Sequence, residues 1–429
     1  MARMMRACRR VGVDSRQASG APASRMFAVL RSDAIGRPSG RPRLHGAIPQ
    51  RPLPRRREFA MTCLVPSGAA IRMITWNRPP DALRTTWIVL RGFLIAFAGG
   101  GLFTLLDFPA AWVAGSTVAV TFAVLARLEV AMPVRLRNVL FVFLGISMGG
   151  GVTPDTVHRL PQWPVSLTIL TVTMALVTAG SYWWFRKVGG WDRMTALTAS
   201  VPGALSYVMV IALDRGADLR KVAIAQTLRI MVLVVIVPLA VTGFGHASAA
   251  AAPAAPEGSW LDLAVLIGAG CAAGLLAEWI RVPAGLLTGA FLASALLHGA
   301  GFVAASLPPV LLVPCFLGVG VMIGGRFAGT DRATLRASFA LAAGGFVVGS
   351  VLATIGAFLT VLAIGVGWGQ SVLAFAPGGL EAMSALSFAL AVDPAFVAAH
   401  QLFRFIGIAI VMPAVIGLLD RADGPPPAR

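Results

Sequence analysis

Two apolar stretches of this chain are interrupted by a Pro-Gly pair, and they decide the fold. The first reads Ser200-Val-Pro-Gly-Ala-Leu-Ser206, and the second reads Phe375-Ala-Pro-Gly-Gly-Leu-Glu381, 175 positions later. Proline interrupts a helix because it lacks a backbone N–H and clashes with the preceding turn. In lipid, the freed backbone groups must find partners in protein or in a water-filled cavity. We therefore predict two broken helical segments, 195–213 and 371–390, that lie between other helices.

The two breaks belong to a longer internal duplication. Self-similarity at a long, fixed spacing indicates repeated structural units. The pairs that recur at the same spacing are Asp218 and Asp393, Gln226 and Gln401, Arg229 and Arg404, Pro238 and Pro413, and Gly145-x-x-x-Gly149 with Gly320-x-x-x-Gly324. The duplication predicts a first membrane repeat at 87–243 and a second at 260–420, joined by an Ala/Pro-rich linker at 244–259.

The composition places both repeats in a lipid bilayer. Of the 429 residues, 57% are apolar and only 13% are charged, whereas a soluble domain carries about 25% charged residues. A hydrocarbon layer of about 30 Å needs about 20 apolar residues in a helix. The sequence predicts an all-α polytopic protein of the bacterial inner membrane with ten spans, at 87–106, 109–126, 138–151, 164–185, 222–243, 260–277, 282–300, 307–325, 337–366 and 395–419.

Basic residues predict how these spans are oriented. If both Pro-Gly segments are re-entrant, the inner loops carry thirteen Lys and Arg residues and the outer loops carry only Arg159. If both segments cross the membrane instead, eight basic residues lie outside. Lys and Arg prefer the cytoplasmic side, so we favour the re-entrant arrangement. Each repeat then crosses five times, and this odd number predicts two inverted repeats.

Most of the formal net charge of +18 comes from residues 1–80, which hold sixteen Arg residues against Asp14, Asp33 and Glu58. This segment is rich in Arg, Pro, Ser, Ala and Gly, so disorder is the default prediction. Three interpretations stay open. Translation could start downstream, at Met61 or Met73, or the tail could resemble an organelle transit segment, or it could bind nucleic acid or anionic lipid.

Chemistry-bearing residues gather around the two breaks. Paired broken helices in inverted repeats are a common plan of secondary transporters, in which the breaks mark the binding site. Arg229 and Arg404 each lie about ten residues, or about 15 Å, into a span, and a charge at that depth faces the bundle interior or a cavity. We predict a solute-binding site without catalytic residues, formed by Pro202, Gly203, Gln226, Arg229, Pro377, Gly378, Gly379, Glu381, His400, Gln401 and Arg404.

Spacing predicts how these side chains are combined. Each Gln lies three residues before its Arg, so the two side chains share a helix face. His400 lies four residues before Arg404 and joins that face, and Glu381 is an expected ionic partner of Arg404. The free N–H groups of the half-helices could hold an anion. The alternative is structural: a kink at each break, and an ion-pair and hydrogen-bond set that holds the two repeats together.

Other polar and small residues have simpler interpretations. Asp218 and Asp393 precede helices by a few residues, as N-capping residues do. Glycines at 98–101, 149–151 and 318–325 are expected to allow close helix contact. Four cysteines lie apart without a CxxC pair, and no two of the five histidines lie within four residues of each other. The spacing predicts no disulfide framework or zinc site, and we expect neither a metal nor a cofactor.

Two motifs resemble the AbrB membrane-protein family, over roughly residues 87–420. One is Ala376-Pro-Gly-Gly-Leu-Glu-Ala-Met383 with the later segment from Asp393 to Arg404, and the other is its first-repeat counterpart. That family is also labelled ammonia monooxygenase, and its hallmark is a duplicated membrane unit. In the first motif the family commonly has Pro-Gly-Gly-x-Ser-Glu, whereas this chain has Ala204 and Tyr207. Tyr207 stands where the family motif has Glu, so only the second motif of this chain has the acidic residue.

Three functions follow as hypotheses. The inverted repeats, paired breaks and deep Arg residues favour a secondary transporter or permease for a small solute, with an anion as one option. The family resemblance implies a membrane protein that regulates gene expression, without direct nucleic acid binding by the membrane body. The ammonia monooxygenase label implies an enzyme, but oxygen activation needs several metal ligands, and only Glu381 and His400 are candidates near the second motif. Assembly into a homo-oligomer stays open.

Overall fold

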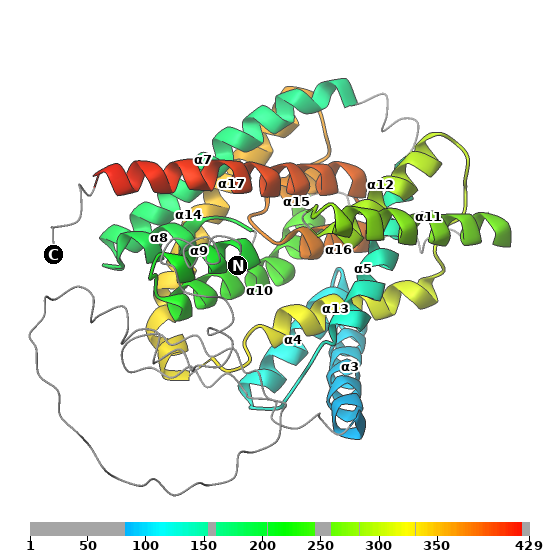
Figure 1. Cartoon of the computed structure of the whole chain (residues 1–429), viewed down its shortest axis with the longest axis horizontal. Coiled ribbons are helices and arrows are strands. Elements are labelled where there is room, and N and C mark those ends of the chain that lie inside the picture. The colour runs from blue at the N-terminus through cyan, green and yellow to red at the C-terminus, as the bar shows by residue number, and fades with distance from the viewer. Residues whose placement is uncertain are drawn as a thin grey trace, which may run out of the picture. The chain divides into compact units, whose positions relative to one another are not determined.

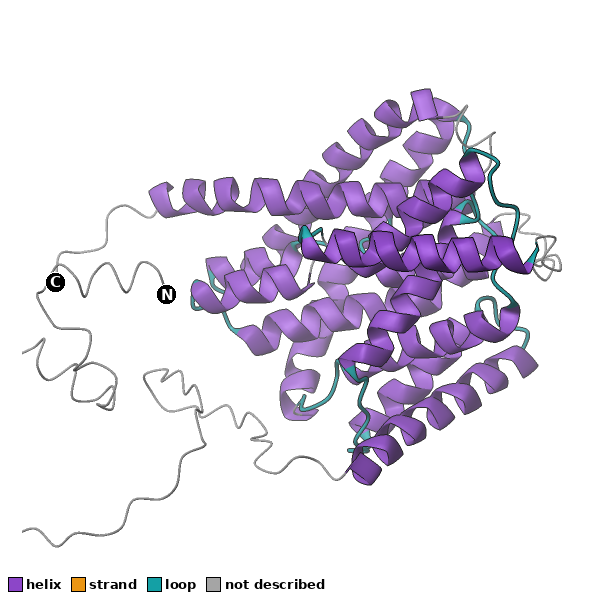
Figure 2. Cartoon of the chain, turned by 45° about the vertical axis from the view of Figure 1, so that its right-hand side comes forward, coloured by secondary structure: helices purple, strands orange, loops and turns teal. Residues whose placement is uncertain are grey.

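The computed structural model describes residues 82–152, 160–203, 205–244, 259–282, 284–330 and 332–422. The chain separates into two units, Met1–Met73 and Ile74–Arg429, and all described residues belong to the second unit. The predicted basic tail at 1–80 and nearly all of the predicted linker lie outside the described residues. Within those residues every regular element is a helix, and there is no strand (Figure 2).

The helices fall into two corresponding sets (Figure 1). The first set is α3 (Ala82–Leu105), α4 (Ala111–Leu125), α5 (Val134–Gly149), the 3-10 turn η1 (Leu160–Gln162), α7 (Trp163–Lys187), α8 (Arg193–Ser200), α9 (Leu205–Asp214) and α10 (Leu219–Phe244). The second set is α11 (Trp260–Trp279), α12 (Gly285–Gly299), α13 (Pro309–Gly325), α14 (Arg332–Ile364), α15 (Trp368–Phe375), α16 (Leu380–Ala389) and α17 (Pro394–Ala422). Helices α8, α9 and α10 begin 175 positions before α15, α16 and α17, as the sequence duplication predicts.

Each of the ten expected spans overlaps one of these helices. Six helices are long and apolar enough to cross a membrane, namely α3, α7, α10, α11, α14 and α17, and four shorter apolar helices are α4, α12, α13 and α16. The described residues therefore form an all-helical fold, with six helices that could span a membrane, which is consistent with a helical membrane protein. The long ninth expected span is one continuous helix, α14, of 33 residues. The two interrupted segments form short helix pairs, α8 with α9 and α15 with α16, whose breaks lie at 201–204 and 376–379.

The two helix sets interlock through small residues. Helix α5 packs on α12, α13 packs on α4, and α7 packs along α14. A Cβ added to Gly149 would collide with Phe291 and Ser294 of α12, and one added to Gly324 would collide with Val120 and Thr121 of α4. The Gly-x-x-x-Gly motifs thus lie at equivalent contacts between the sets. The predicted role in close helix packing is confirmed for Gly149 and Gly324, whereas no heavy atom lies within 4 Å of a Cβ added to Gly101 or Gly325.

Each short helix pair forms a hairpin whose two ends lie close together. We name residues 193–214 the first hairpin and residues 368–389 the second hairpin. At the base of the first hairpin the backbone N–H of Asp218 donates to Thr195 Oγ1 over 2.7 Å. At the base of the second, Gln370 Nε2 donates to Asp393 Oδ2 over 3.2 Å. Thr195 and Gln370 are equivalent positions of the duplication, as are the two aspartates. Both hairpins are therefore closed by the same pair of positions.

The same aspartates begin the helices that follow the hairpins. Asp218 Oδ1 accepts hydrogen bonds from the backbone N–H groups of Arg220 and Lys221, at 3.1 and 3.3 Å. Asp393 Oδ1 accepts from Ala395 and Phe396, at 3.0 and 3.1 Å. These bonds satisfy N–H groups that have no partner within the helix. The predicted N-capping role of both residues is confirmed.

The bases of the two hairpins lie at opposite ends of α10. At the start of α10, the ammonium of Lys221 lies 5.8 Å from the ring centroid of Trp191, just before the first hairpin. Near the end of α10, the carbonyl of Ala240 accepts a hydrogen bond of 3.3 Å from Trp368 Nε1, at the start of the second hairpin. The stretch from 221 to 240 is about 28 Å long at 1.5 Å per residue. The hairpins therefore approach the middle of α10 from opposite directions.

Candidate functional site

The tips of the two hairpins meet. Gly203 has a φ of +91°, and a Cβ at this position would lie 3.3 Å from Arg404 Nη2 and 3.4 Å from the carbonyl oxygen of Gly378. A positive φ and such a close approach both favour glycine. The structure thus brings together three predicted site residues from the two breaks and from α17, which are far apart in the sequence.

The first Gln-Arg pair holds the end of α8. Gln226 Nε2 donates to the carbonyl oxygens of Thr198 and Val201, at 2.9 Å in both cases. Arg229 Nη2 donates to the same Val201 carbonyl over 3.1 Å and also to Gln226 Oε1. Both side chains come from the middle of α10. They replace the partners that the Pro202 break takes away from these carbonyl groups.

The second Gln-Arg pair holds the end of α15 in the same way, through more hydrogen bonds. Gln401 Nε2 donates to the carbonyls of Leu373, Ala374 and Ala376, at 2.8, 3.3 and 3.3 Å. Arg404 Nη1 donates to Ala376, and its Nη2 donates to Gly378, both over 2.6 Å. Arg404 also donates to Gln401 Oε1. The last carbonyls of a helix carry its negative dipole end, so a cation is well placed here.

Both guanidinium groups are nearly enclosed, and each has one N–H donor without a hydrogen-bond partner. Arg229 is 7% exposed and Arg404 is 4% exposed, and the Nε atom of each is buried without a hydrogen-bond partner. Among the described residues neither side chain forms an ion pair with a carboxylate. The site therefore holds two buried positive charges that no acidic residue of the described part neutralises at close range.

Glu381 does not have the partner that the sequence suggested. It lies in the first turn of α16, with its Oε2 atom 3.3 Å from where a Cβ of Gly379 would be. Arg404 is held by the carbonyls of the tip, so it does not turn to Glu381. Burial lowers the pKa of Arg326, after the end of α13, and the charge of Glu381 opposes that shift. Among the described residues Glu381 forms no ion pair with Arg404.

The side chain of His400 contacts α7 and does not form a hydrogen bond to the groups that hold Arg404. Its Nε2 atom lies 2.8 Å from Ser166 Oγ of α7, and its Nδ1 atom lies 2.8 Å from the Phe396 carbonyl. The rings of Trp163 and Phe396 pack against it, with centroids at 5.9 and 3.8 Å. The side chain therefore joins α17 to α7. The ring of His400 also lies 6.5 Å from that of Phe375, at the end of α15, whereas Arg404 contacts the carbonyls of the second break.

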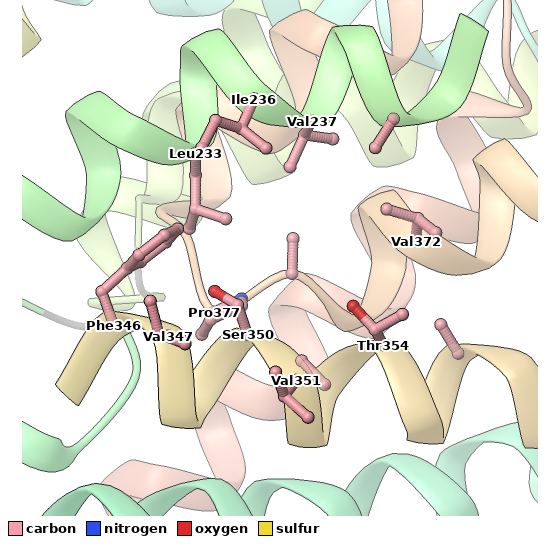
Figure 3. Close-up of a pocket in the computed structure, with 14 residues that line it drawn as sticks. Leu233, Ile236, Val237, Phe346, Val347, Ser350, Val351, Thr354, Val372 and Pro377 are labelled. Atoms are coloured by element: carbon pink, nitrogen blue, oxygen red, sulfur yellow. The ribbon is translucent and has the colours of Figure 1, made fainter. Parts of the chain in front are cut away.

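A cavity of about 180 Å³ reaches the second break from one side. Figure 3 shows it between α10, α14 and the break, with Leu233 and Val237 on one wall and Val347 and Val351 on another. Pro377 lies at its boundary, whereas Pro202 is buried at the first break. The lining is mostly apolar apart from two hydroxyl side chains of α14, and the Oγ atom of one, Ser350, is buried without a hydrogen-bond partner.

Sequence reasoning missed this cavity. Its hydroxyl side chains, Ser350 and Thr354, lie in α14, and they are spaced four residues apart on one helix face. That spacing is the only signal in the sequence that could have indicated them. Among the described residues no group of three or more His, Cys, Asp and Glu side chains could hold a metal ion.

Comparisons with known proteins extend the resemblance beyond the two motifs. The sequence model of the family described as "Transition state regulatory protein AbrB" matches residues 112–420. The chain is 27% identical over 387 residues to "Uncharacterized protein YhjN" of Bacillus subtilis (strain 168), an alignment that covers 81% of this chain and 96% of the relative. It is 26% identical over 328 residues to "Putative regulator AbrB" of Escherichia coli (strain K12), covering 73% of this chain and 91% of that protein.

Proposed function

The chain belongs to the AbrB family, and we propose that it is a secondary transporter for a small anion in the bacterial inner membrane. The proposal starts from the place where the hairpin tips meet. Transporters commonly bind their solute near the bilayer midplane, between broken helices of two repeats. Gly203, Gly378 and the two Gln-Arg pairs form such a place in this chain.

In the proposed topology each repeat crosses the bilayer five times. The spans are α3, α4, α5, α7 and α10 in the first repeat, and α11, α12, α13, α14 and α17 in the second. Five is odd, so the repeats are inverted and the two hairpins dip in from opposite faces. The hairpin bases at opposite ends of α10 support this arrangement, and so does the distribution of Lys and Arg among the loops.

The two buried arginines are the observation that carries the choice of an anion. A charged side chain at the centre of a membrane helix costs about 2.5–3.5 kcal/mol on insertion, and buried charges are normally paired. Arg229 and Arg404 come from different repeats and lie at adjoining tips. No described carboxylate pairs with them, and each has a free Nε donor. A bound anion would supply the missing negative charge.

Uptake into proteoliposomes tests the proposal. We expect vesicles that contain the protein to take up at least one of four radiolabelled anions, namely acetate, lactate, succinate and phosphate. Uptake should fall to the level of empty vesicles in Arg404→Ala. The matched control is Arg336→Ala, because Arg336 is an exposed residue of α14 and its loss should leave uptake unchanged.

A second measurement separates loss of binding from loss of folding. The anion that is transported should raise the thermal unfolding temperature of the wild-type protein in detergent, because a ligand that binds the folded state stabilises it. Arg404→Lys keeps the charge and should keep part of this shift. Wild-type vesicles that move none of these anions, combined with no thermal shift for any of them, would contradict the proposal.

A further inference from the structure

The cavity beside the second break has a buried inner wall and an open rim. Leu233 and Val237 of α10 and Ala357 of α14 line the inner wall and are at most 4% exposed. Val347 and Val351 of α14 line the rim and are 55% and 54% exposed. Helices α10 and α14 are both long and apolar enough to span a membrane. The cavity is thus a lateral recess between two expected spans (Figure 3).

The inner end of the cavity lies at the candidate anion site. Ala376 and Pro377 of the second break line it. The carbonyl of Ala376 accepts a hydrogen bond of 2.6 Å from Arg404 Nη1. Ala376 is therefore both a wall of the cavity and a direct neighbour of a buried positive charge. A solute with one charged end and one apolar end has complementary surroundings for both at this residue.

The size and the lining of the cavity suit a hydrocarbon group. Its volume is about 180 Å³, and an apolar protein cavity of about 150 Å³ stays dry and binds benzene. None of the described residues that line it has a titratable side chain, so a second charge there would be unpaired and costly. The cavity therefore has room for a ring or chain of about six carbon atoms.

The hydroxyl groups of the cavity are not part of the duplicated support of the breaks. Ser350 and Thr354 correspond to Ala175 and Ala179 of α7, 175 positions earlier, and Val237 corresponds to the larger Met412 of α17. The Gln-Arg pairs, in contrast, occur in both repeats. The Oγ atom of Ser350 is buried without a hydrogen-bond partner, which is unfavourable, and an acceptor oxygen of a bound molecule would supply that partner.

We propose that this cavity binds the hydrocarbon part of the transported anion, whose class is the monocarboxylates with a chain or ring of about six carbon atoms. This inference rests on the proposed anion transport and names its substrate class. The carboxylate is attracted by the charge of Arg404, and the hydrocarbon part leaves water for the apolar wall beside Ala376. Burial of apolar surface is favourable in proportion to the area removed from water, so a longer chain binds more tightly until the cavity is full.

Binding of radiolabelled acetate, butyrate and hexanoate to the protein in lipid nanodiscs tests the inference, with empty nanodiscs as the blank. Each methylene that the cavity buries should lower the dissociation constant about fourfold. Hexanoate should therefore bind more tightly than butyrate, and butyrate more tightly than acetate. Equal dissociation constants for the three anions would overturn the inference, and this is the result expected if an acyl chain of a surrounding lipid fills the cavity permanently.

Ala353→Leu tests whether the cavity is responsible for this preference. Ala353 lines the cavity and is 4% exposed, so the three added carbon atoms fill part of the cavity instead of turning outward. The preference for hexanoate over acetate should fall several-fold. The matched control is Ala340→Leu, at an exposed position of α14 outside the cavity, which should keep the wild-type preference. An unchanged preference in Ala353→Leu would overturn the inference, and the wild-type series decides it if this variant does not fold.

Uptake of the same three anions into proteoliposomes separates this inference from the proposed function. If binding tightens with chain length but none of the anions enters the vesicles, the proposed transport fails while the cavity site stands. If acetate is taken up and binding does not depend on chain length, only the cavity site fails.

Discussion

Arg404→Met is expected to lower the free energy of unfolding by about 2–5 kcal/mol, because it leaves the carbonyl of Gly378 and the Oε1 atom of Gln401 without a donor. The carbonyl of Ala376 keeps its hydrogen bond from Gln401 Nε2. Each buried acceptor left unpaired costs roughly 1–3 kcal/mol. Removal of the buried charge recovers part of this cost. The expected loss of stability is therefore smaller than the sum of the largest costs of the unpaired acceptors. Chemical unfolding in mixed detergent micelles is the measurement.

Arg229→Met should be less damaging than Arg404→Met. Arg229 donates to one backbone carbonyl, that of Val201, which also accepts from Gln226. Arg336→Met, on the exposed side of α14, should change stability by no more than about 0.5 kcal/mol, as is usual for surface substitutions. Equal losses for Arg229→Met and Arg404→Met would show that the backbone bonds at the second tip are not what makes Arg404 important.

Gly203→Ala should disrupt the contact between the two hairpin tips. A Cβ at this position would meet Arg404 Nη2 and the Gly378 carbonyl at 3.3 and 3.4 Å, and the φ of +91° is unfavourable for alanine. Backbone strain costs about 1–3 kcal/mol, and overpacking of a filled interior costs a further 1–3 kcal/mol or so. We expect a loss of about 2–4 kcal/mol in stability and a loss of anion uptake.

Gly216→Ala is the matched control for this substitution. Gly216 also has a positive φ, +68°, but no heavy atom lies within 4 Å of the added Cβ. Left-handed backbone alone costs alanine roughly 1–2 kcal/mol. The difference between the two variants therefore measures the contact between the hairpin tips. If Gly216→Ala were as damaging as Gly203→Ala in unfolding and uptake, the tips would not meet as described.

The helices and the two breaks could be predicted from the sequence because their signals are local. Pro202 and Pro377 stop α8 and α15, Asp218 caps α10, and long apolar runs define the spans. The common spacing of 175 then related Gln226 and Arg229 to their second-repeat counterparts. All of these patterns depend on residues close in the chain, or on a repeated copy of such residues.

The partners of individual side chains could not be predicted in the same way. His400 and Arg404 are four positions apart, so they share a helix face broadly, but α17 has α7 on one side and the second hairpin on the other. Which neighbour each side chain meets depends on how helices from different parts of the chain pack. The separation of Glu381 from Arg404 and the cavity beside Ser350 have the same origin, because both are produced by tertiary packing.

Thiol labelling of the two hairpin bases tests the central claim most directly. Gly216→Cys and Ala391→Cys place a cysteine at an exposed position after each hairpin, in a chain whose four native cysteines are replaced by alanine. The inverted arrangement predicts that a membrane-impermeant maleimide labels position 391 in intact cells and position 216 only in inside-out vesicles. Labelling of both positions from the same side of the membrane would contradict the account.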